Sequence, residues 1–444
     1  MTNDMTKGSP MGLILAFMIP TCLGNIFQQF YNLADSIIAG RYIGVNALAA
    51  IGSTSSLIFL VIGWMNGITS GFAIMVAQSF GARKYDRMRH YVAMSIYLCL
   101  GFVVVMTSAL LVLNYPILRM MNAPDDIIHD TASYMAIIYA GLFVTAAYNA
   151  FAAVLRALGD GKSPLYFLII SAVINVALDV IFIVQFHMGV EGCAYATVIA
   201  QGISALLCLV YIIRKFEILR LQKEDFSLDF GTMRKLLSIG IPMGLQFSIT
   251  AIGTIIVQGA VNVFGAVYIA GFSAAGKIQN IVCTVFVSFG ATIATYVGQN
   301  RGAGEMERIK QGVKVTQIMI LVWSVVTIAI VSLFGETLIH IFVEGSQTEV
   351  IQAAKQYFVT VSWCYPFLGS IFLYRNALQG LGYGFMPMMG GVFELIARAI
   401  AVAVAVKLGF GFMGVCAADP AAWIAALIPI VPYYFHVMKK TGLA

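Results

Sequence analysis

The chain has 444 residues, of which 60% are hydrophobic and only 10% are charged, and its mean hydropathy is +0.89. This composition excludes an ordinary soluble globular protein and indicates an all-α polytopic membrane protein. The formal net charge of +6 does not call for a nucleic-acid partner, because basic residues of membrane proteins gather in cytoplasmic loops.

Twelve apolar runs along the chain are long enough to cross a bilayer. A membrane-spanning helix needs roughly 20 mostly apolar residues. We therefore predict spans at 11–38, 50–79, 92–117, 131–155, 165–186, 192–213, 237–263, 278–299, 311–334, 351–374, 386–406 and 412–436.

Lysine and arginine placement predicts how these spans are oriented. Most basic residues fall at the two termini and in the connections after spans 2, 4, 6, 8 and 10. Because basic residues are enriched in cytoplasmic loops, we expect both termini in the cytoplasm and the protein in the cell membrane.

The sequence divides into two related halves. The polar stretch "RKFEILRLQKEDFSLDFGTMRK" separates a first six-helix lobe, 1–213, from a second, 236–444, as a linker at 214–235. "VAQSFGARKYDR" (from 76) matches "VGQNRGAGEMER" (from 297) at an offset of 221, and "LGDGKSP" (from 158) matches "LGYGFMP" (from 381) at 223.

An even number of spans in each half makes the repeat parallel. Both halves then enter the membrane from the same side and are related by a pseudo-two-fold axis along the membrane normal, which is a transporter architecture. Pro20, within the first span, lies over Pro242 at an offset of 222. Prolines inside spans supply bend points beside a cavity.

Two carboxylates of the first half lie within spans and lack a basic neighbour at helical spacing. They are Asp35 and Asp179, and Asn32 and Asn175 precede them by three and four residues. Each pair lies on one helix face. If spans 1 and 5 meet, two carboxylates in a low dielectric cannot both stay ionised cheaply, so a proton or Na⁺ is expected between them. The alternative is a structural role in which protonated acids hydrogen-bond between helices.

The second half carries ionisable residues of a different kind. Glu394 and Arg398 lie four residues apart and are expected to neutralise each other on one helix. Asp419 lies over Thr197 at an offset of 222. Because Asp419 comes just before Pro420 at the start of a span, a helix-capping role is at least as well supported as an ion-binding one.

No sequence feature indicates an enzyme. The chain contains no phosphate-binding P-loop, no Gly-rich dinucleotide fingerprint, no metal-ligand spacing among its five histidines and no evident nucleophile–base constellation. We expect no cofactor beyond a coupling ion, and no metal beyond Na⁺ at the Asp35, Asn175 and Asp179 positions.

Several motifs together resemble the multidrug and toxic compound extrusion (MATE) transporters, which are antiporters that expel drugs in exchange for H⁺ or Na⁺. The resemblance covers the chain nearly end to end and rests on Pro20 with "NLADSIIAGRYIGVNALAAIG", "LRALGDGKSPLYFLIISAVINVALD", "GCAYATVIAQ" and "LQGLGYGFMP".

The resemblance implies a set of cation-site residues. The branch that resembles DNA-damage-inducible efflux proteins uses an acid in helix 1 and an Asn/Asp pair in helix 5, which correspond to Asp35, Asn175 and Asp179. A helix-6 threonine and a helix-4 tyrosine join that site in relatives, and Thr197 and Tyr139 are the candidates here. Another branch uses an acid in helix 7, but residues 242–262 contain no Asp or Glu.

The resemblance also implies the substrates and the assembly. Such proteins export lipophilic, often cationic compounds, and we expect amphiphilic small molecules and the lipid bilayer as partners of a functional monomer. A flippase for lipid-linked oligosaccharides or a related amphiphile remains the alternative on a related architecture, although it would be expected to carry a more basic cavity. A receptor or scaffold would leave the unpaired acids and the duplication unexplained.

Overall fold

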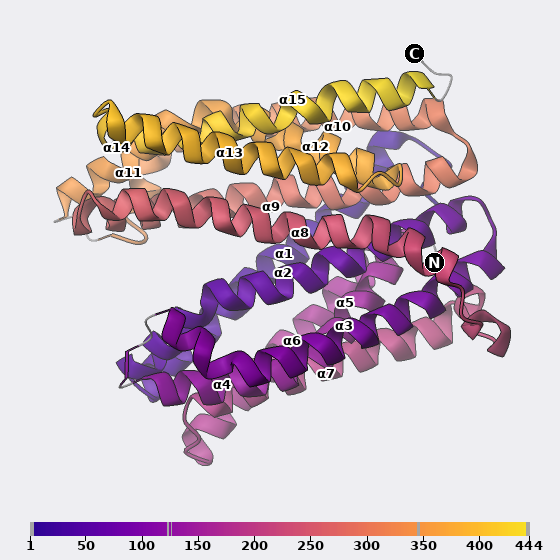
Figure 1. The fold of residues 1–444 in the computed structure, drawn as a ribbon, viewed down its shortest axis with the longest axis horizontal. Helices are drawn as coiled ribbons and strands as arrows, with labels where there is room; N and C mark the ends of the chain where they lie inside the picture. The colour runs from indigo at the N-terminus through magenta and orange to yellow at the C-terminus, as the bar shows by residue number, and fades with distance from the viewer. Residues whose placement is uncertain (1–3, 122–123, 126, 344–346, 441–444) are drawn as a thin grey trace. The chain divides into compact units, whose positions relative to one another are not determined.

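The apolar runs form long helices because a backbone surrounded by hydrocarbon must satisfy its hydrogen bonds internally. In the computed structural model, which describes residues 4–121, 124–125, 127–343 and 347–440, no strand occurs among these residues. The first-half helices (Figure 1) are α1 Pro10–Tyr42, α2 Val45–Gly81, α3 Tyr85–Met120, α4 Ile128–Ala140, α5 Leu142–Ala157, α6 Lys162–Val180 and α7 Val190–Lys215. The second-half helices are α8 Phe230–Asn262, α9 Ala266–Ala303, α10 Met306–Ile339, α11 Thr348–Val361, α12 Tyr365–Gly380, α13 Phe385–Lys407, α14 Gly411–Cys416 and α15 Ala418–Lys440.

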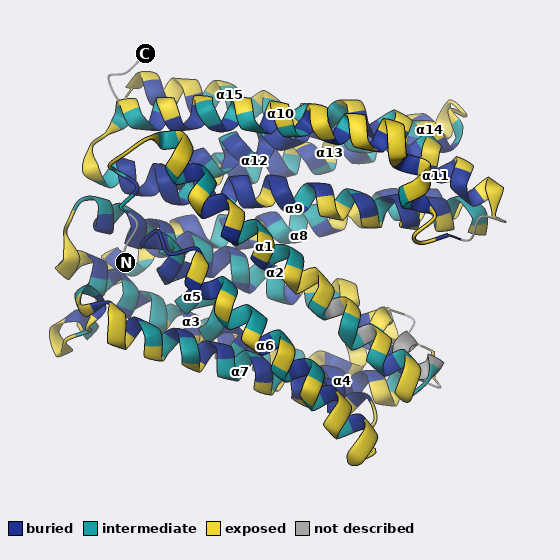
Figure 2. Cartoon of the chain, turned by 180° about the vertical axis from the view of Figure 1, so that it is seen from behind, coloured by how far each residue is buried: buried dark blue, intermediate teal, exposed yellow. Residues whose placement is uncertain are grey.

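These helices confirm the predicted spans and a multi-pass membrane protein. Among the described residues, 11 helices are long and apolar enough to cross a membrane, and α4 with α5 makes a twelfth span bent by 46° at Gly141. The outward faces of α3 and α10 carry large apolar side chains, such as Val112 at 78% exposed and Leu333 at 76% exposed. Figure 2 shows such exposed positions along the helices. In a membrane these faces contact lipid.

Short helical segments complete the chain. They are η1 Ile181–Gln185, η2 Glu217–Leu219, η3 Lys223–Phe226 and η4 Ser362–Cys364. Among them η1 is a π-helical turn that continues α6, and η4 joins α11 to α12 in the second half. Each half therefore has a fourth span built from two helical pieces.

The backbone repeats the pattern found in the sequence. Gly44 and Gly265 occupy equivalent positions of the repeat, have positive φ values of 124° and 92°, and each precedes the second helix of its half. Gly159 and Gly382, another equivalent pair, have φ values of 82° and 88° in the turn after the fourth span. These values favour glycine because a Cβ is strained there.

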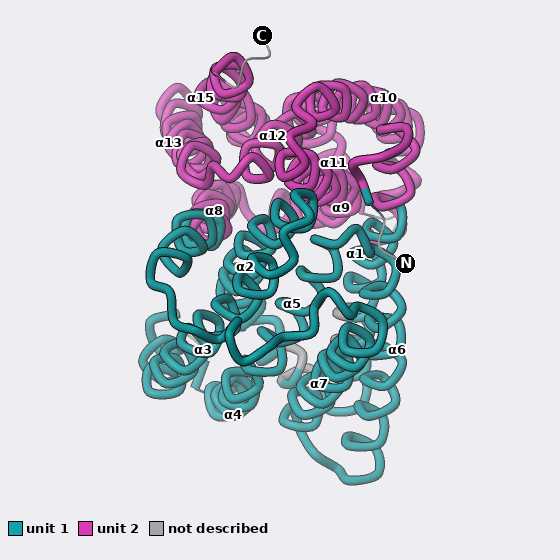
Figure 3. Tube along the Cα trace, turned by 90° about the vertical axis from the view of Figure 1, so that its right-hand side faces the viewer, with its two compact units in different colours: residues 1–4, 19–244 teal, residues 5–18, 245–444 magenta. Residues whose placement is uncertain are grey.

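Two packed units follow the two halves, except at their leading helices. Residues 19–244 belong to one unit, and residues 5–18 together with 245–440 belong to the other (Figure 3). Helix α1 changes unit next to Pro20, and α8 changes unit next to Pro242. We call them the first and second unit.

The chain segments before α1 and α8 are held by polar contacts at matching places. In the second unit, Met5 N donates to Gln299 Oε1 at 2.9 Å, and Arg308 Nη2 donates to the Met5 carbonyl at 3.3 Å. In the first unit, Arg89 Nε donates to Asp225 Oδ2 at 3.1 Å, and the Asp225 carbonyl lies 2.9 Å from His90 Nδ1. Each leading helix therefore starts from a fixed point.

Candidate functional site

Three helices of the first unit bring together the polar residues predicted for ion binding. Asp35 lies on α1, Asn175 and Asp179 lie on one face of α6, and Thr197 lies on α7. Asn175 Nδ2 donates to Thr197 Oγ1 at 3.4 Å, and Thr197 Oγ1 in turn donates to Asp35 Oδ2 at 3.5 Å. The two carboxyl groups are direct neighbours. We call these four residues the acidic cluster.

The acidic cluster is rich in oxygen and poor in donors. Asn175 and Asp179 are 0% exposed, and Asp35 is half-buried. Among the described residues, four of its oxygens have no hydrogen-bond partner: Asp35 Oδ1, Asn175 Oδ1 and both carboxylate oxygens of Asp179. Neighbouring carboxylates repel each other when both are ionised. A proton or a hard cation such as Na⁺, which prefers oxygen ligands, would relieve this repulsion.

Local sequence places Asp179 at an irregular point of its helix. Asn175 and Asp179 are four residues apart, so one helical turn puts both on the same face. Two residues after Asp179, the π-helical turn η1 begins and covers residues 181–185. Such turns are rare and are found frequently at functional sites. At the other end of α6, Asp160 Oδ1 accepts from the backbone N–H of Ser163 at 3.0 Å, which fixes where the helix begins.

The tyrosines beside the acidic cluster differ from the one expected. Tyr134 on α4 interacts electrostatically with Asp35 and Asp179, and Tyr31 on α1 interacts with Asp35 and Thr197. Tyr139 is 0% exposed and packs in an apolar cluster. Among the described residues its hydroxyl has no hydrogen-bond partner, and it interacts with neither carboxyl. The helix-4 tyrosine at the cluster is therefore Tyr134, and the expectation for Tyr139 is corrected.

Two further predicted residues lie on α1. The side chain of Asn32 falls outside the described residues. Pro20 lies inside α1, where the packing of the helix passes from the second unit to the first. Its place is compatible with a bend point.

The charged residues of the second unit form an ion-paired group. Arg398 Nη2 donates to Glu394 Oε1 at 3.1 Å, as the four-residue spacing predicted. Arg398 Nε also donates to Asp419 Oδ1 at 3.0 Å. Asp419 lies in the first turn of α15, but its carboxylate is an ion-pair partner, so the helix-cap interpretation is not supported. The sequence pattern missed this contact because the two residues lie on different helices.

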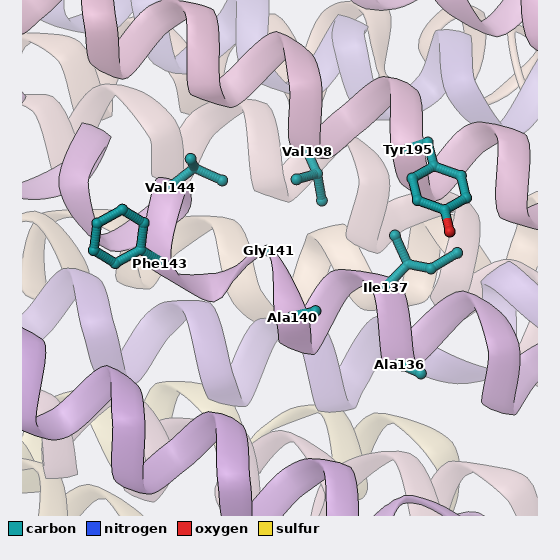
Figure 4. Close-up of a pocket in the computed structure, with 8 residues that line it drawn as sticks. All are labelled: Ala136, Ile137, Ala140, Gly141, Phe143, Val144, Tyr195 and Val198. Carbon is teal, nitrogen blue, oxygen red and sulfur yellow. The ribbon is translucent and has the colours of Figure 1, made fainter.

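An apolar groove opens where the fourth span of the first unit bends (Figure 4). Its volume is about 440 Å³. Two of the side chains that line it, Phe143 and Tyr195, are 55% and 42% exposed. The lining residues are Ala136, Ile137, Ala140, Gly141, Phe143, Val144, Tyr195 and Val198. Because these side chains are largely apolar, the groove suits hydrocarbon and contributes no ion chemistry.

Comparison with known proteins places this geometry among transporters. The family model described as MatE matches residues 20–181 and 242–419. "Probable multidrug resistance protein YoeA" of Bacillus subtilis is 28% identical over 99% of this chain and 96% of its own length. "Probable multidrug resistance protein YpnP" of the same organism is 29% identical over 85% of this chain and 84% of its own length.

A solved structure shares the fold. The structure described as the outward-facing conformation of a multidrug resistance MATE family transporter superposes with a TM-score of 0.92 at 21% identity, over 99% of this chain and 98% of that one. At this identity the likeness establishes the fold.

Proposed function

The chain belongs to the MatE family of membrane transporters, and from that premise we propose that it is a secondary active antiporter that exports lipophilic, often cationic compounds in exchange for H⁺ or Na⁺. The acidic cluster carries this proposal. Its two neighbouring carboxyls and the amide oxygen of Asn175 offer buried acceptors without a matching donor among the described residues, which is the chemistry of a site that gains and loses a small cation.

The coupling step assigns a role to each residue of the acidic cluster. Asp35 and Asp179 take up the proton or Na⁺, Asn175 supplies an amide oxygen, and Thr197 orients Asp35 through its hydroxyl. Asp35 lies on α1, so ion uptake changes the charge that α1 presents to α6 and α7. The ion shifts the equilibrium between inward-open and outward-open states only if it binds those states with different affinity. Bending of α1 near Pro20 is the proposed movement.

The substrate class rests on the relatives. Two curated relatives are named as multidrug resistance proteins. The chain contains 30 phenylalanines and 22 methionines, which can supply adaptable apolar contacts and aromatic faces that attract cations.

On this proposal the protein works as a monomer in the cell membrane, with both termini in the cytoplasm and with H⁺ or Na⁺ as its only ionic partner.

Transport in proteoliposomes tests the proposal. Uptake and efflux of a fluorescent lipophilic cation are measured with a pH gradient and a Na⁺ gradient imposed separately, for the wild type, Asp35→Asn and Asp179→Asn. We expect one gradient to drive wild-type transport and both variants to lose that drive. Transport that survives in both variants would assign the acids a structural role. Absence of transport under either gradient would favour the flippase, to be tested with a lipid-linked oligosaccharide.

A further inference from the structure

The ion-paired group of the second unit is almost sealed from solvent. Arg398 is 3% exposed and Glu394 is 6% exposed, and the side chain of Asp419 is 13% exposed. Removing charges from water is costly unless they are paired with good geometry. Arg398 meets this requirement by pairing with a carboxylate on its own helix α13 and with one on α15.

A third helix completes the surroundings of Arg398. Its Nη1 atom lies against Gly253 of α8, too close for a Cβ on that glycine to fit beside it. Nη1 has no hydrogen-bond partner among the described residues. A side chain at position 253 would displace the guanidinium, so the glycine makes room for the charge.

The equivalent three positions of the repeat in the first unit lie in or beside the acidic cluster. Arg398 lies over Asn175 at an offset of 223, Asp419 lies over Thr197 at 222, and Gly253 lies over Tyr31 at 222. The offsets equal those of the sequence repeat. In the first unit the Asn175 amide donates to the Thr197 hydroxyl at 3.4 Å. In the second unit the Arg398 guanidinium donates to the Asp419 carboxylate at 3.0 Å.

The two arrangements differ in the source of positive charge. In the first unit, no basic side chain among the described residues interacts with the carboxylates of Asp35 and Asp179. Their counterparts in the second unit are the apolar Val257 and Val402, while its acids, Glu394 and Asp419, are joined by Arg398.

We propose that Arg398 is a tethered cation that permanently fills the second unit's counterpart of the ion site. Its guanidinium supplies the charge that the first unit must take from solution. Because a covalently attached charge cannot leave, this position cannot exchange ions, and coupling is confined to the acidic cluster. Arg398 is thus a residue that sets the number of exchangeable ions per transport cycle. The role of Arg398 in transport rests on the proposed antiport function. The number of ions that the protein binds at equilibrium can be measured without that assumption.

The side chains around the ion-paired group determine which charges would stay unpaired if Arg398 were removed. Arg375 on α12 interacts electrostatically with Glu394. Tyr357 on α11 and Cys416 on α14 interact with Asp419, and Cys283 on α9 interacts with both acids. Without Arg398, Glu394 would keep a basic neighbour, but Asp419 would have no basic partner among these groups. A new site would therefore centre on Asp419.

Equilibrium counting of bound ions tests the proposal. Purified protein in lipid nanodiscs is assayed for bound ²²Na⁺ and, by potentiometric titration, for exchangeable protons. The variants are the wild type, Arg398→Gln and Arg398→Lys, each with and without Asp35→Asn. We expect Arg398→Gln to hold one more Na⁺ or proton per molecule than the wild type, and to keep it when Asp35 is also replaced. Arg398→Lys, which retains the charge, should match the wild type.

Two results would overturn the proposal: an unchanged ion count in folded Arg398→Gln, or an extra ion that disappears with Asp35→Asn. If Arg398→Gln does not fold, the triple variant Glu394→Gln/Arg398→Gln/Asp419→Asn decides. This variant has neither the Glu394 nor the Asp419 carboxylate, so no carboxylate of the ion-paired group is left without a partner when Arg398 is removed. A folded protein with the wild-type ion count supports the proposal. A protein that does not fold, or that has a different ion count, contradicts it. A wild-type count that is insensitive to Asp35→Asn would instead contradict the proposed antiport site, independently of the second unit.

Discussion

Some contacts of the acidic cluster can be predicted from the sequence, and others can be found only in the structure. Spacing put Asn175 and Asp179 on one helix face, and Asp35 and Thr197 were also predicted; the structure adds the contacts that join them, at 3.4 and 3.5 Å. Tyr134 and Tyr139 are both helix-4 tyrosines, but five residues turn a helix by about 140°. Choosing between them needs the rotation of α4 about its own axis, which packing decides.

Replacing single tyrosines tests this choice. We expect Tyr134→Phe to weaken the apparent affinity for the coupling ion by about fivefold, because one hydroxyl close to the carboxyls is worth about 1 kcal/mol. Tyr139→Phe removes a hydroxyl that interacts with neither carboxyl among the described residues, and should leave the affinity unchanged. The measurement is the ion concentration that gives half-maximal transport. A larger effect of Tyr139→Phe than of Tyr134→Phe would show that Tyr139, and not Tyr134, is the helix-4 tyrosine of the ion site.

At the scale of helices, hydropathy located all the spans but not their breaks. The apolar run from 131 to 155 continues across Gly141, so nothing in its composition shows that α4 ends at Ala140 and α5 starts at Leu142. The reason is steric. A Cβ at Gly141 would collide with Val198 Cγ2 on α7. The close packing of α7 against the bend therefore requires a glycine at this position. Such contacts between distant positions are invisible to a sequence window.

Gly141→Ala is predicted to destabilise the first unit. An added methyl group in a well-packed site forces shifts that cost about 1–3 kcal/mol, which should lower the thermal unfolding midpoint of the purified protein. Gly202→Ala is the matched control, because a Cβ there would meet Val144 Cγ1 at an ordinary 3.5 Å. Equal unfolding midpoints for the two variants would contradict the steric account of the bend.

For the whole molecule, the repeat predicted equivalent positions but not packing partners. Its nearly constant offset predicted two matching sets of helices, and the structure also has positive-φ glycines at equivalent positions. It could not indicate that residues 5–18 pack with the second unit. That assignment depends on contacts such as Met5 N to Gln299 Oε1, which join residues far apart in sequence and have no signature in the local composition.

Reporter fusions test the predicted orientation of the whole chain. We expect green fluorescent protein fused after Lys440 to fluoresce, and alkaline phosphatase at the same position to be inactive, because the phosphatase needs disulfides that form outside the cytoplasm. Alkaline phosphatase fused after Met121, which follows the third span, should be active. The reverse pattern would place both termini outside.

The central claim is that one ion site in the first unit is linked to substrate binding, and linkage is measurable without a gradient. If substrate and ion compete through two states, each must lower the affinity of the other by the same factor, typically between about 5-fold and 150-fold. The measurement is ion release, as protons or ²²Na⁺, when a lipophilic cation is added to purified protein in lipid nanodiscs. We predict release from the wild type and none from Asp35→Asn or Asp179→Asn that still bind the compound. Release of the same size from both variants would contradict the account.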